Sequence, residues 1–165
     1  MLRFEVVVEV PKGSRNKYEI DHRTGVVRLD RQLFTATRYP ADYGFAQDTL
    51  GEDGDPLDAL VILDEPTFPG CHIEVRAVGV LHTHDEAGGD PKLLTVPYHD
   101  PRVRWDDIGD VPAYLLLEIR HFFEIYKDLE PGKGTVVEGW DGRGVAEELL
   151  REGLERAKRE AHNAS

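Results

Sequence analysis

The spacing of the apolar residues changes at about Pro112, and this change limits the folds that the chain can adopt. Before that point apolar and polar residues alternate in short runs. The first run places four apolar residues on one face of a strand: Phe4, Val6, Val8 and Val10. After Pro112 the apolar residues recur every three or four positions, as in amphipathic helices. Strands followed by helices predict an α+β fold.

The first half carries two hairpin signals. Residues 17–21 and 26–31 flank a short polar turn, and residues 74–81 and 92–96 form a second pair of strand-like runs. The apolar run 61–63 is a further strand candidate. We expect these strands to form a small closed or partly closed sheet.

The second half predicts two helices. One begins at Pro112, which suits a first helical turn, and ends before Pro131. The other covers residues 145–161. The length of 165 residues, without a repeat or linker, predicts a single domain spanning residues 1–165.

The formal net charge of −12 excludes some classes of partner. Nucleic-acid-binding proteins neutralise phosphates with a basic surface, so no nucleic acid is expected. An acidic protein still binds a phosphate compound if divalent cations reverse the local charge. No run of about 18 apolar residues suggests a membrane span. The lone Cys71 cannot form an internal disulfide, which favours the cytoplasm.

The densest group of carboxylates lies in residues 53–58, where Asp53, Asp55 and Asp58 occur within six positions. Hard divalent cations prefer several oxygen ligands, and without cations such carboxylates repel one another. The spacing does not fit the EF-hand calcium loop, because Asp58 stands where that loop requires glycine. For these three residues alone, a metal site and an exposed acidic turn are about equally good interpretations.

A second acidic pair, Asp85 and Asp90, flanks the turn of the second expected hairpin. If the two residues face each other across the hairpin, their carboxylates could share a metal ion. Lys92 shares a strand face with Asp90. The alternative is an exposed polar hairpin tip.

Basic residues gather on the first expected hairpin. Lys17 and Glu19 project from one strand face, and Arg31 lies on the partner strand. These side chains form either a clamp for phosphate oxygens or ordinary surface ion pairs. Three tyrosines could add hydroxyl donors or could serve in packing: Tyr39, Tyr43 and Tyr126.

Seven segments resemble, in order, those of the soluble family I inorganic pyrophosphatases: 9–11, 16–21, 29–31, 39–44, 53–59, 85–92 and 121–130. The resemblance covers nearly the whole chain and is strongest to short bacterial, particularly actinobacterial, members. It implies an OB-like five-stranded closed β-barrel with flanking α-helices, two main helices in the C-terminal half, and assembly as a homohexamer.

The resemblance also implies hydrolysis of pyrophosphate to two orthophosphates by a metal-activated water, with several Mg²⁺ ions per site. The implied metal ligands are Glu9, Glu19, Asp53, Asp58, Asp85 and Asp90. The implied substrate-binding residues are Lys17, Arg31, Tyr39, Tyr43, Lys92, Tyr126 and Lys127. Asp55 and Asp90 are the candidates for the general base.

Two departures from the family pattern, Pro91 and Gly134, remove no ligand. Two other functions remain as alternatives. A non-catalytic metal- or phosphate-binding OB module would need the carboxylates but no basic clamp. A phosphohydrolase acting on nucleoside triphosphates would need a base-binding pocket in addition.

Overall fold

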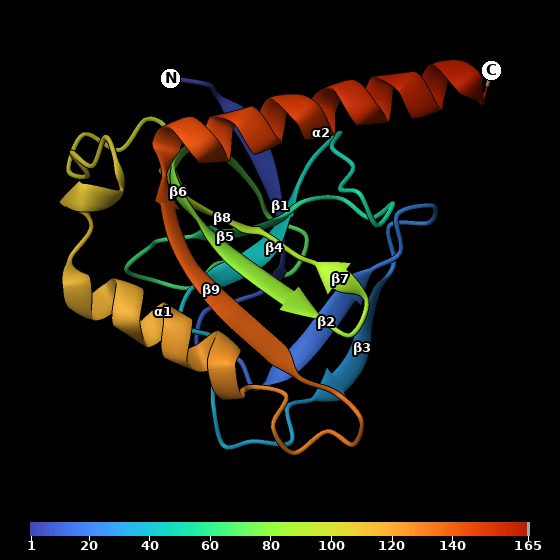
Figure 1. Ribbon diagram of the computed structural model, residues 1–165, viewed down its shortest axis with the longest axis vertical. Helices are drawn as coiled ribbons and strands as arrows, with labels where there is room; N and C mark the ends of the chain where they lie inside the picture. Colours follow the sequence, from blue (N-terminus) through green and yellow to red (C-terminus); the bar gives the residue numbers. More distant parts are fainter. Residues whose placement is uncertain (165) are drawn as a thin grey trace.

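A computed structural model describes residues 1–164 (Figure 1). The strands and helices follow one another in this order: β1 (Phe4–Val10), β2 (Asn16–Ile20), β3 (Val27–Gln32), β4 (Asp42–Ala46), β5 (Asp58–Val61), β6 (His72–Asp85), β7 (Gly88–Gly89), β8 (Lys92–Pro97), η1 (Ile108–Asp110), α1 (Ala113–Ile125), β9 (Thr135–Gly142) and α2 (Arg143–Asn163). No helix within this described part is long and apolar enough to cross a membrane.

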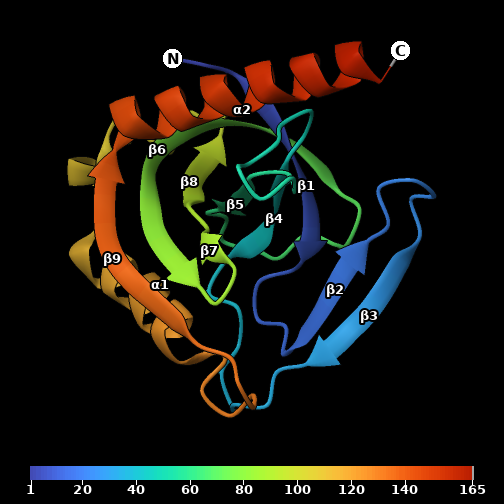
Figure 2. The ribbon, with the colours of Figure 1, turned by 45° about the vertical axis from the view of Figure 1, so that its right-hand side comes forward.

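Five strands close into a ring in the order β1–β4–β5–β8–β6, and pairing of β1 with β6 completes it. All pairs in the ring are antiparallel except β5 and β8. The long strand β6 also pairs with β9 over residues 79–85, beyond its contact with β1. Hairpin β2–β3 stands outside the ring, as Figure 2 shows. The expected five-stranded barrel with two helices in the C-terminal half is thus confirmed.

Each helix packs against a different set of barrel side chains. Helix α1 contributes Ile119, Phe122 and Phe123 to a cluster that contains Leu60 and Leu94. Helix α2 contributes Ala146 and Leu150 to a second cluster around Ala59, Val61 and Leu93. Because neighbouring residues of one strand point to opposite faces, β5 and β8 supply both clusters. The barrel strands that carry the site are therefore supported from two sides.

Both predicted hairpins form, with β2 paired to β3 and β6 paired to β8. The strand expected at residues 61–63 instead begins at Asp58. Strands β4 and β9 were not predicted. Every residue of β4 is buried, so no polar–apolar alternation marks it. A side chain at Gly44 would place its Cβ 1.9 Å from the Val7 carbonyl oxygen, so only glycine allows this approach of β4 to β1.

Candidate active site

A groove of about 720 Å³ opens between the end of the barrel, hairpin β2–β3 and the loop after α1. Nine carboxylates and five lysine or arginine side chains line it, which gives the lining a net negative charge. The lining residues are Glu9, Lys17, Glu19, Ile20, Asp21, His22, Asp30, Arg31, Tyr43, Phe45, Asp55, Pro56, Asp58, Asp85, Glu86, Asp90, Lys92, Tyr126, Lys127 and Lys133.

A buried ammonium group lies at the base of the groove. The Lys92 side chain is 1% exposed, and its Nζ lies 3.0 Å from Asp58 Oδ2 and 2.9 Å from Asp90 Oδ2. Nζ also donates to the Tyr43 hydroxyl at 2.8 Å, and that hydroxyl donates to Asp58. The Phe123 ring centroid lies 4.9 Å from Nζ. One lysine thus holds two carboxylates in place while an aromatic ring covers it.

Strand pairing explains why these groups meet. Strands β5 and β8 run parallel, and their first residues, Asp58 and Lys92, are partners in the register. Tyr43 comes from the neighbouring strand β4 and is the partner of Leu60, which shares a strand face with Asp58. Asp90 lies two residues before Lys92 and so points the same way. The closed ring therefore brings side chains from three strands to one point.

Burial and charge act in opposite directions on these groups. Burial favours the neutral form of Lys92, but the charges of Asp58 and Asp90 outweigh it and raise the pKa of the ammonium. Burial raises the pKa of Asp90, and Lys92 opposes that effect. Burial also raises the pKa of Glu9 to about 7, although Glu9 accepts a 2.8 Å hydrogen bond from the Ile20 N–H. The groove thus keeps carboxylates in surroundings that penalise their charge.

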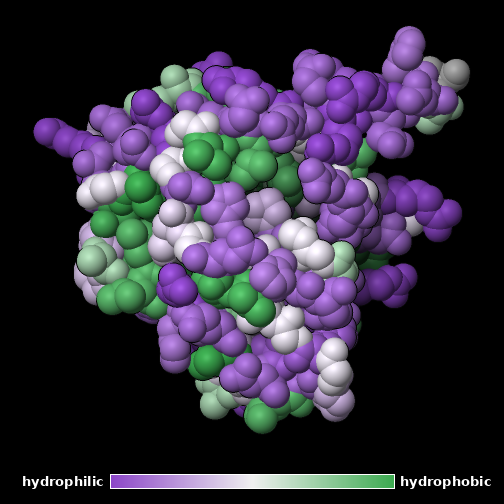
Figure 3. Space-filling model, viewed as in Figure 1, coloured by the Kyte–Doolittle hydropathy of each residue, from purple (hydrophilic) through white to green (hydrophobic). Residues whose placement is uncertain are grey.

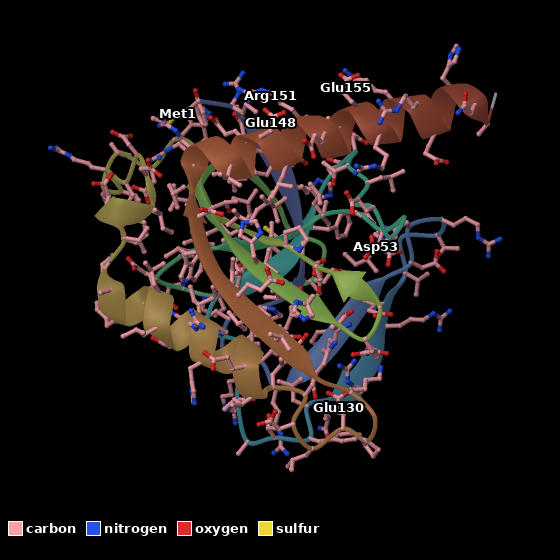
Figure 4. All side chains as sticks on the ribbon, viewed as in Figure 1. Met1, Asp53, Glu130, Glu148, Arg151 and Glu155 are labelled. Atoms are coloured by element: carbon pink, nitrogen blue, oxygen red, sulfur yellow. The ribbon has the colours of Figure 1, made fainter. Side chains whose placement is uncertain are left out.

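A chain of ion pairs orders the cations on hairpin β2–β3. Arg31 lies on the partner strand of Lys17, as expected, and the two residues are partners in the register. Lys17 Nζ lies 2.9 Å from Glu19 and 3.4 Å from Asp30, and Asp30 also binds Arg31. Arg31 Nε lies 2.9 Å from Oε1 of Glu130, a buried residue on the loop after α1 that Figure 4 labels. Both cations are held facing the groove.

The end of α1 supplies further donors. Tyr126 follows the last residue of the helix, is buried and lines the groove. The next residue, Lys127, places Nζ 3.6 Å from Oδ2 of Asp85. Asp85 Oδ1 also accepts the Ala87 N–H at 2.8 Å. The end of α1 therefore brings a tyrosine to the groove and an ammonium to the acidic end of β6.

The acidic loop before β5 is tightly turned. Asp53 Oδ1 accepts the Asp55 N–H at 3.0 Å, and the Gly51 N–H donates to the Asp55 carbonyl at 2.7 Å. Gly54 has φ +87°, a conformation that favours glycine. Asp55 faces the groove, whereas Asp53 lines an adjoining cavity of about 150 Å³ that lies toward α2 and shares Asp58 and Asp90 with the groove.

The donor set fits hard divalent cations, because it consists of carboxylate oxygens in excess over the lysines and arginines. Within residues 1–164, no three His, Cys, Asp or Glu side chains form a ready-made metal-binding group. The carboxylates are directed at protein donors instead: Asp58 and Asp90 at Lys92, Asp85 at Lys127 and Glu19 at Lys17. Asp58, Asp90 and Glu19 each use one carboxylate oxygen in these ion pairs, so the second oxygen is available to a cation.

The groove brings together twelve of the fourteen residues singled out in the sequence. Asp53 lies in the adjoining cavity. Tyr39 is 1% exposed, does not line the groove and packs behind Tyr43 at 5.4 Å between ring centroids, as in the packing alternative. Its side chain supports the wall of the groove. The functional roles of all fourteen residues stay predictions.

The expected pairing of Asp85 with Asp90 across the hairpin is also wrong. Asp90 faces Thr83, whose carbonyl accepts the Asp90 N–H at 2.8 Å, while Asp85 is the partner of Gly88. The short strand β7 forms a tighter turn than expected and shifts the register by two residues. The two carboxylates consequently bind different lysines.

Sequence reasoning assigned no role to Asp30 or Glu130, the two carboxylates that hold Arg31. Asp30 adjoins Arg31 in the chain, and both residues belong to segments that carry the family resemblance. Glu130 is 99 residues from Arg31, so only the fold reveals their contact. Asp21, Glu86 and Lys133 also line the groove without having been singled out as site residues.

The fold and the groove define a small β-barrel protein whose site combines oxygen ligands suited to divalent cations with basic donors suited to an anion. Comparisons with known proteins identify its family. The sequence pattern described as Inorganic pyrophosphatase matches residues 6–158. The chain therefore belongs to the inorganic pyrophosphatase family.

Individual relatives agree with this assignment. The inorganic pyrophosphatase of Streptomyces coelicolor is 61% identical over 95% of this chain and 97% of its own length. That of Leifsonia xyli is 55% identical over 98% and 100%. Both organisms are actinobacteria, as the resemblance implied. The crystal structure of inorganic pyrophosphatase from Thermus thermophilus is 50% identical over 94% of this chain and 91% of that chain, with a TM-score of 0.92.

The buried lysine generates a prediction about stability. Replacing Lys92 by Met leaves Asp58 and Asp90 facing each other without a cation, so we expect the free energy of unfolding to fall by about 3 kcal/mol. Denaturant titration in the presence of a chelator measures this loss. Lys133→Met removes an exposed lysine from the same groove and should change stability by less than about 0.5 kcal/mol. Equal stability of the two variants would contradict the prediction.

Proposed function

We propose that this protein hydrolyses inorganic pyrophosphate to two orthophosphates in the groove, with Mg²⁺ as its metal. The observation that carries the proposal is the Lys92-bridged pair of carboxylates beside the Lys17–Arg31 clamp. Membership of the inorganic pyrophosphatase family supports the substrate. The free thiol of Cys71 supports a cytoplasmic location, where thiols stay reduced.

Carboxylates of the groove and of the adjoining cavity would hold the metal ions: Glu9, Glu19, Asp53, Asp58, Asp85 and Asp90. Divalent cations held there would offset the charge of pyrophosphate and would lower the pKa of a coordinated water to about 7. Asp58 and Asp90 border both the groove and the adjoining cavity. They are therefore placed to bind metal ions on both sides of this border.

The basic side chains would act on the leaving phosphate. Water forms a bond to one phosphorus while the bond from that phosphorus to the bridging oxygen breaks, and negative charge develops on the departing group. Lys17 and Arg31 of hairpin β2–β3, and Tyr126 and Lys127 after α1, line the groove and would donate to that group. Because Glu130 and Asp30 already fix Arg31, little reorganisation is needed as the charge develops.

Two carboxylates could take the proton from the attacking water. Asp90 is partly buried beside Lys92, and burial raises its pKa toward that of a better base. Asp55 is exposed on the turn of the acidic loop and also lines the groove. We therefore keep both as candidates for the general base.

The substrate and the metal can be tested together. We expect phosphate release from pyrophosphate to stop in excess chelator and to return with Mg²⁺, because the net negative groove cannot bind pyrophosphate without cations. Ca²⁺ should bind but support little turnover, since its coordination is looser. A phosphate-release assay measures both effects. Full activity in chelator would contradict the metal requirement, and ATP turnover as fast as that of pyrophosphate would favour a nucleotide substrate.

Asp58 provides a test of the assigned roles. Asp58→Asn removes a charge but keeps the shape, so we expect turnover to fall by about 10²-fold or more while the fold survives. Asp64→Asn changes an exposed carboxylate outside the groove and should leave turnover nearly unchanged. Turnover rates at saturating Mg²⁺, with circular dichroism as a check of folding, decide the matter. Near-normal turnover in Asp58→Asn would identify a merely structural acidic turn.

We also propose that the chain forms a homo-oligomer, as a hexamer. Tyr114 and Leu117 on α1 are 70% and 66% exposed, and Val136 on the adjacent strand β9 is 54% exposed. Hydrophobic side chains gather on the side of the molecule where α1 lies (Figure 3). Large apolar patches on folded proteins usually mark partner surfaces, and closed symmetric assemblies are the common outcome.

The proposed interface generates a prediction about assembly. Leu117→Glu would bury a charge in this surface, so we expect a shift toward smaller species in multi-angle light scattering at neutral pH. Phe68→Glu makes the same change at a residue that is 63% exposed in the connection between β5 and β6, and it should leave the mass unchanged. A wild-type monomer, or an identical mass for both variants, would contradict the proposed interface.

A further inference from the structure

The middle of α2 contacts the loop that carries Asp53 and Asp55. This loop, residues 47–57, joins β4 to β5 and rises toward α2 in Figure 2. Arg156 and Leu149 of α2 line the same cavity of about 150 Å³ as Asp53, Asp58 and Asp90. A helix remote in sequence thus forms one wall of a cavity that adjoins the candidate site.

Both backbone polar groups of Leu50 are bound by α2. The Leu50 N–H donates to the Gly153 carbonyl at 3.0 Å, and the Leu50 carbonyl accepts Nη1 of Arg156 at 2.8 Å. When both the N–H and the carbonyl of a loop residue are hydrogen-bonded, its peptide groups cannot rotate without breaking a hydrogen bond. The contact therefore fixes the orientation of the backbone three residues before Asp53.

Gly153 allows this close approach. A Cβ atom at this position would lie 2.8 Å from Leu57 Cδ1 and 3.3 Å from both the Leu50 carbonyl oxygen and Thr49 Cβ. The two ends of the loop, near Thr49 and Leu57, thus pack against one helical residue. Any larger side chain there would press on the loop.

Hydrogen bonds within the loop link the position of Leu50 to the positions of the Asp53 and Asp55 carboxylates. The buried Thr49 hydroxyl donates to the Ala46 carbonyl at 2.7 Å and accepts the Leu57 N–H at 3.0 Å, which closes the base of the loop. From Gly51 onward, the turn is held by its own bonds to Asp55. Because the turn follows Leu50 directly, moving Leu50 moves Asp53 and Asp55 with it.

We propose that α2 sets the position of the Asp53–Asp55 turn, with Arg156 as a positioning residue for metal binding and turnover. This inference rests on the proposed function for the roles of the two aspartates, but the contact between α2 and the loop does not. Asp58 and Lys92 belong to barrel strands and keep their places without this contact.

Hydrogen exchange on the metal-free, full-length protein tests the contact directly. In Arg156→Ala we expect the amides of residues 50–55 to exchange about tenfold faster, because the loop opens more easily, while the amides of β6 and β8 stay protected. Gly153→Ala should act in the same direction by displacing Leu57. Arg156→Lys keeps a donor for the Leu50 carbonyl and should restore most of the protection.

Arg151→Ala is the matched control, since Arg151 lies on the same helix and forms an ion pair with exposed Glu148. Calorimetric titration with Mg²⁺ and the Mg²⁺ dependence of phosphate release should show weaker Mg²⁺ binding in Arg156→Ala by about threefold or more, with kcat nearly restored at saturating Mg²⁺. Equal exchange and equal Mg²⁺ binding in Arg156→Ala and Arg151→Ala would overturn the proposal. Wild-type protein without Mg²⁺ binding or phosphate release would instead refute the proposed function, and the exchange data would still decide the contact.

Discussion

The candidate site depends on a lysine ammonium that is buried inside a ring of strands. Removing such a charge from water is costly, and the cost is offset only because two carboxylates and a tyrosine hydroxyl surround Lys92 Nζ. The same arrangement holds Asp58 and Asp90 close together, although like charges repel. The lysine thus acts as an internal cation in a region rich in carboxylates. Divalent ions would add charge of the same sign to a site already organised around a cation.

The architecture separates the two chemical tasks of the groove. The closed barrel supplies Tyr43, Asp58 and Lys92 from neighbouring strands, where the register fixes their distances. The phosphate-binding candidates Lys17 and Arg31 come from a hairpin outside the ring and are ordered by ion pairs. Each part also carries counter-charges, because Glu19 and Asp30 hold the hairpin cations and Lys92 holds the barrel carboxylates. An anion in the groove would meet cationic donors of the hairpin and carboxylate oxygens suited to metal ions at the end of the barrel.

Sequence patterns predicted the contacts between residues that lie close to one another in the chain. The pairing of Lys17 with Arg31 follows from a hairpin, and the acidic loop is a contiguous segment. Strand β4 was missed because it is buried on both faces, and the position of Asp90 opposite Thr83 depends on the short strand β7. The contact of Glu130 with Arg31 spans 99 residues. The burial of Tyr39 likewise depends on packing that no local pattern encodes.

The fold holds some candidate metal ligands more firmly than others. The ligands on the loop depend on contacts with α2 for their position. Asp58 begins a barrel strand and is the register partner of Lys92, so its position follows from ring closure. Asp53 and Asp55 lie on a glycine-containing turn, whose own bonds determine its shape but not its location. Location requires contacts outside the turn, and Gly153 and Arg156 supply them through Leu50. A site assembled from strands and a loop therefore needs an anchor for the loop, and in this protein a C-terminal helix provides it.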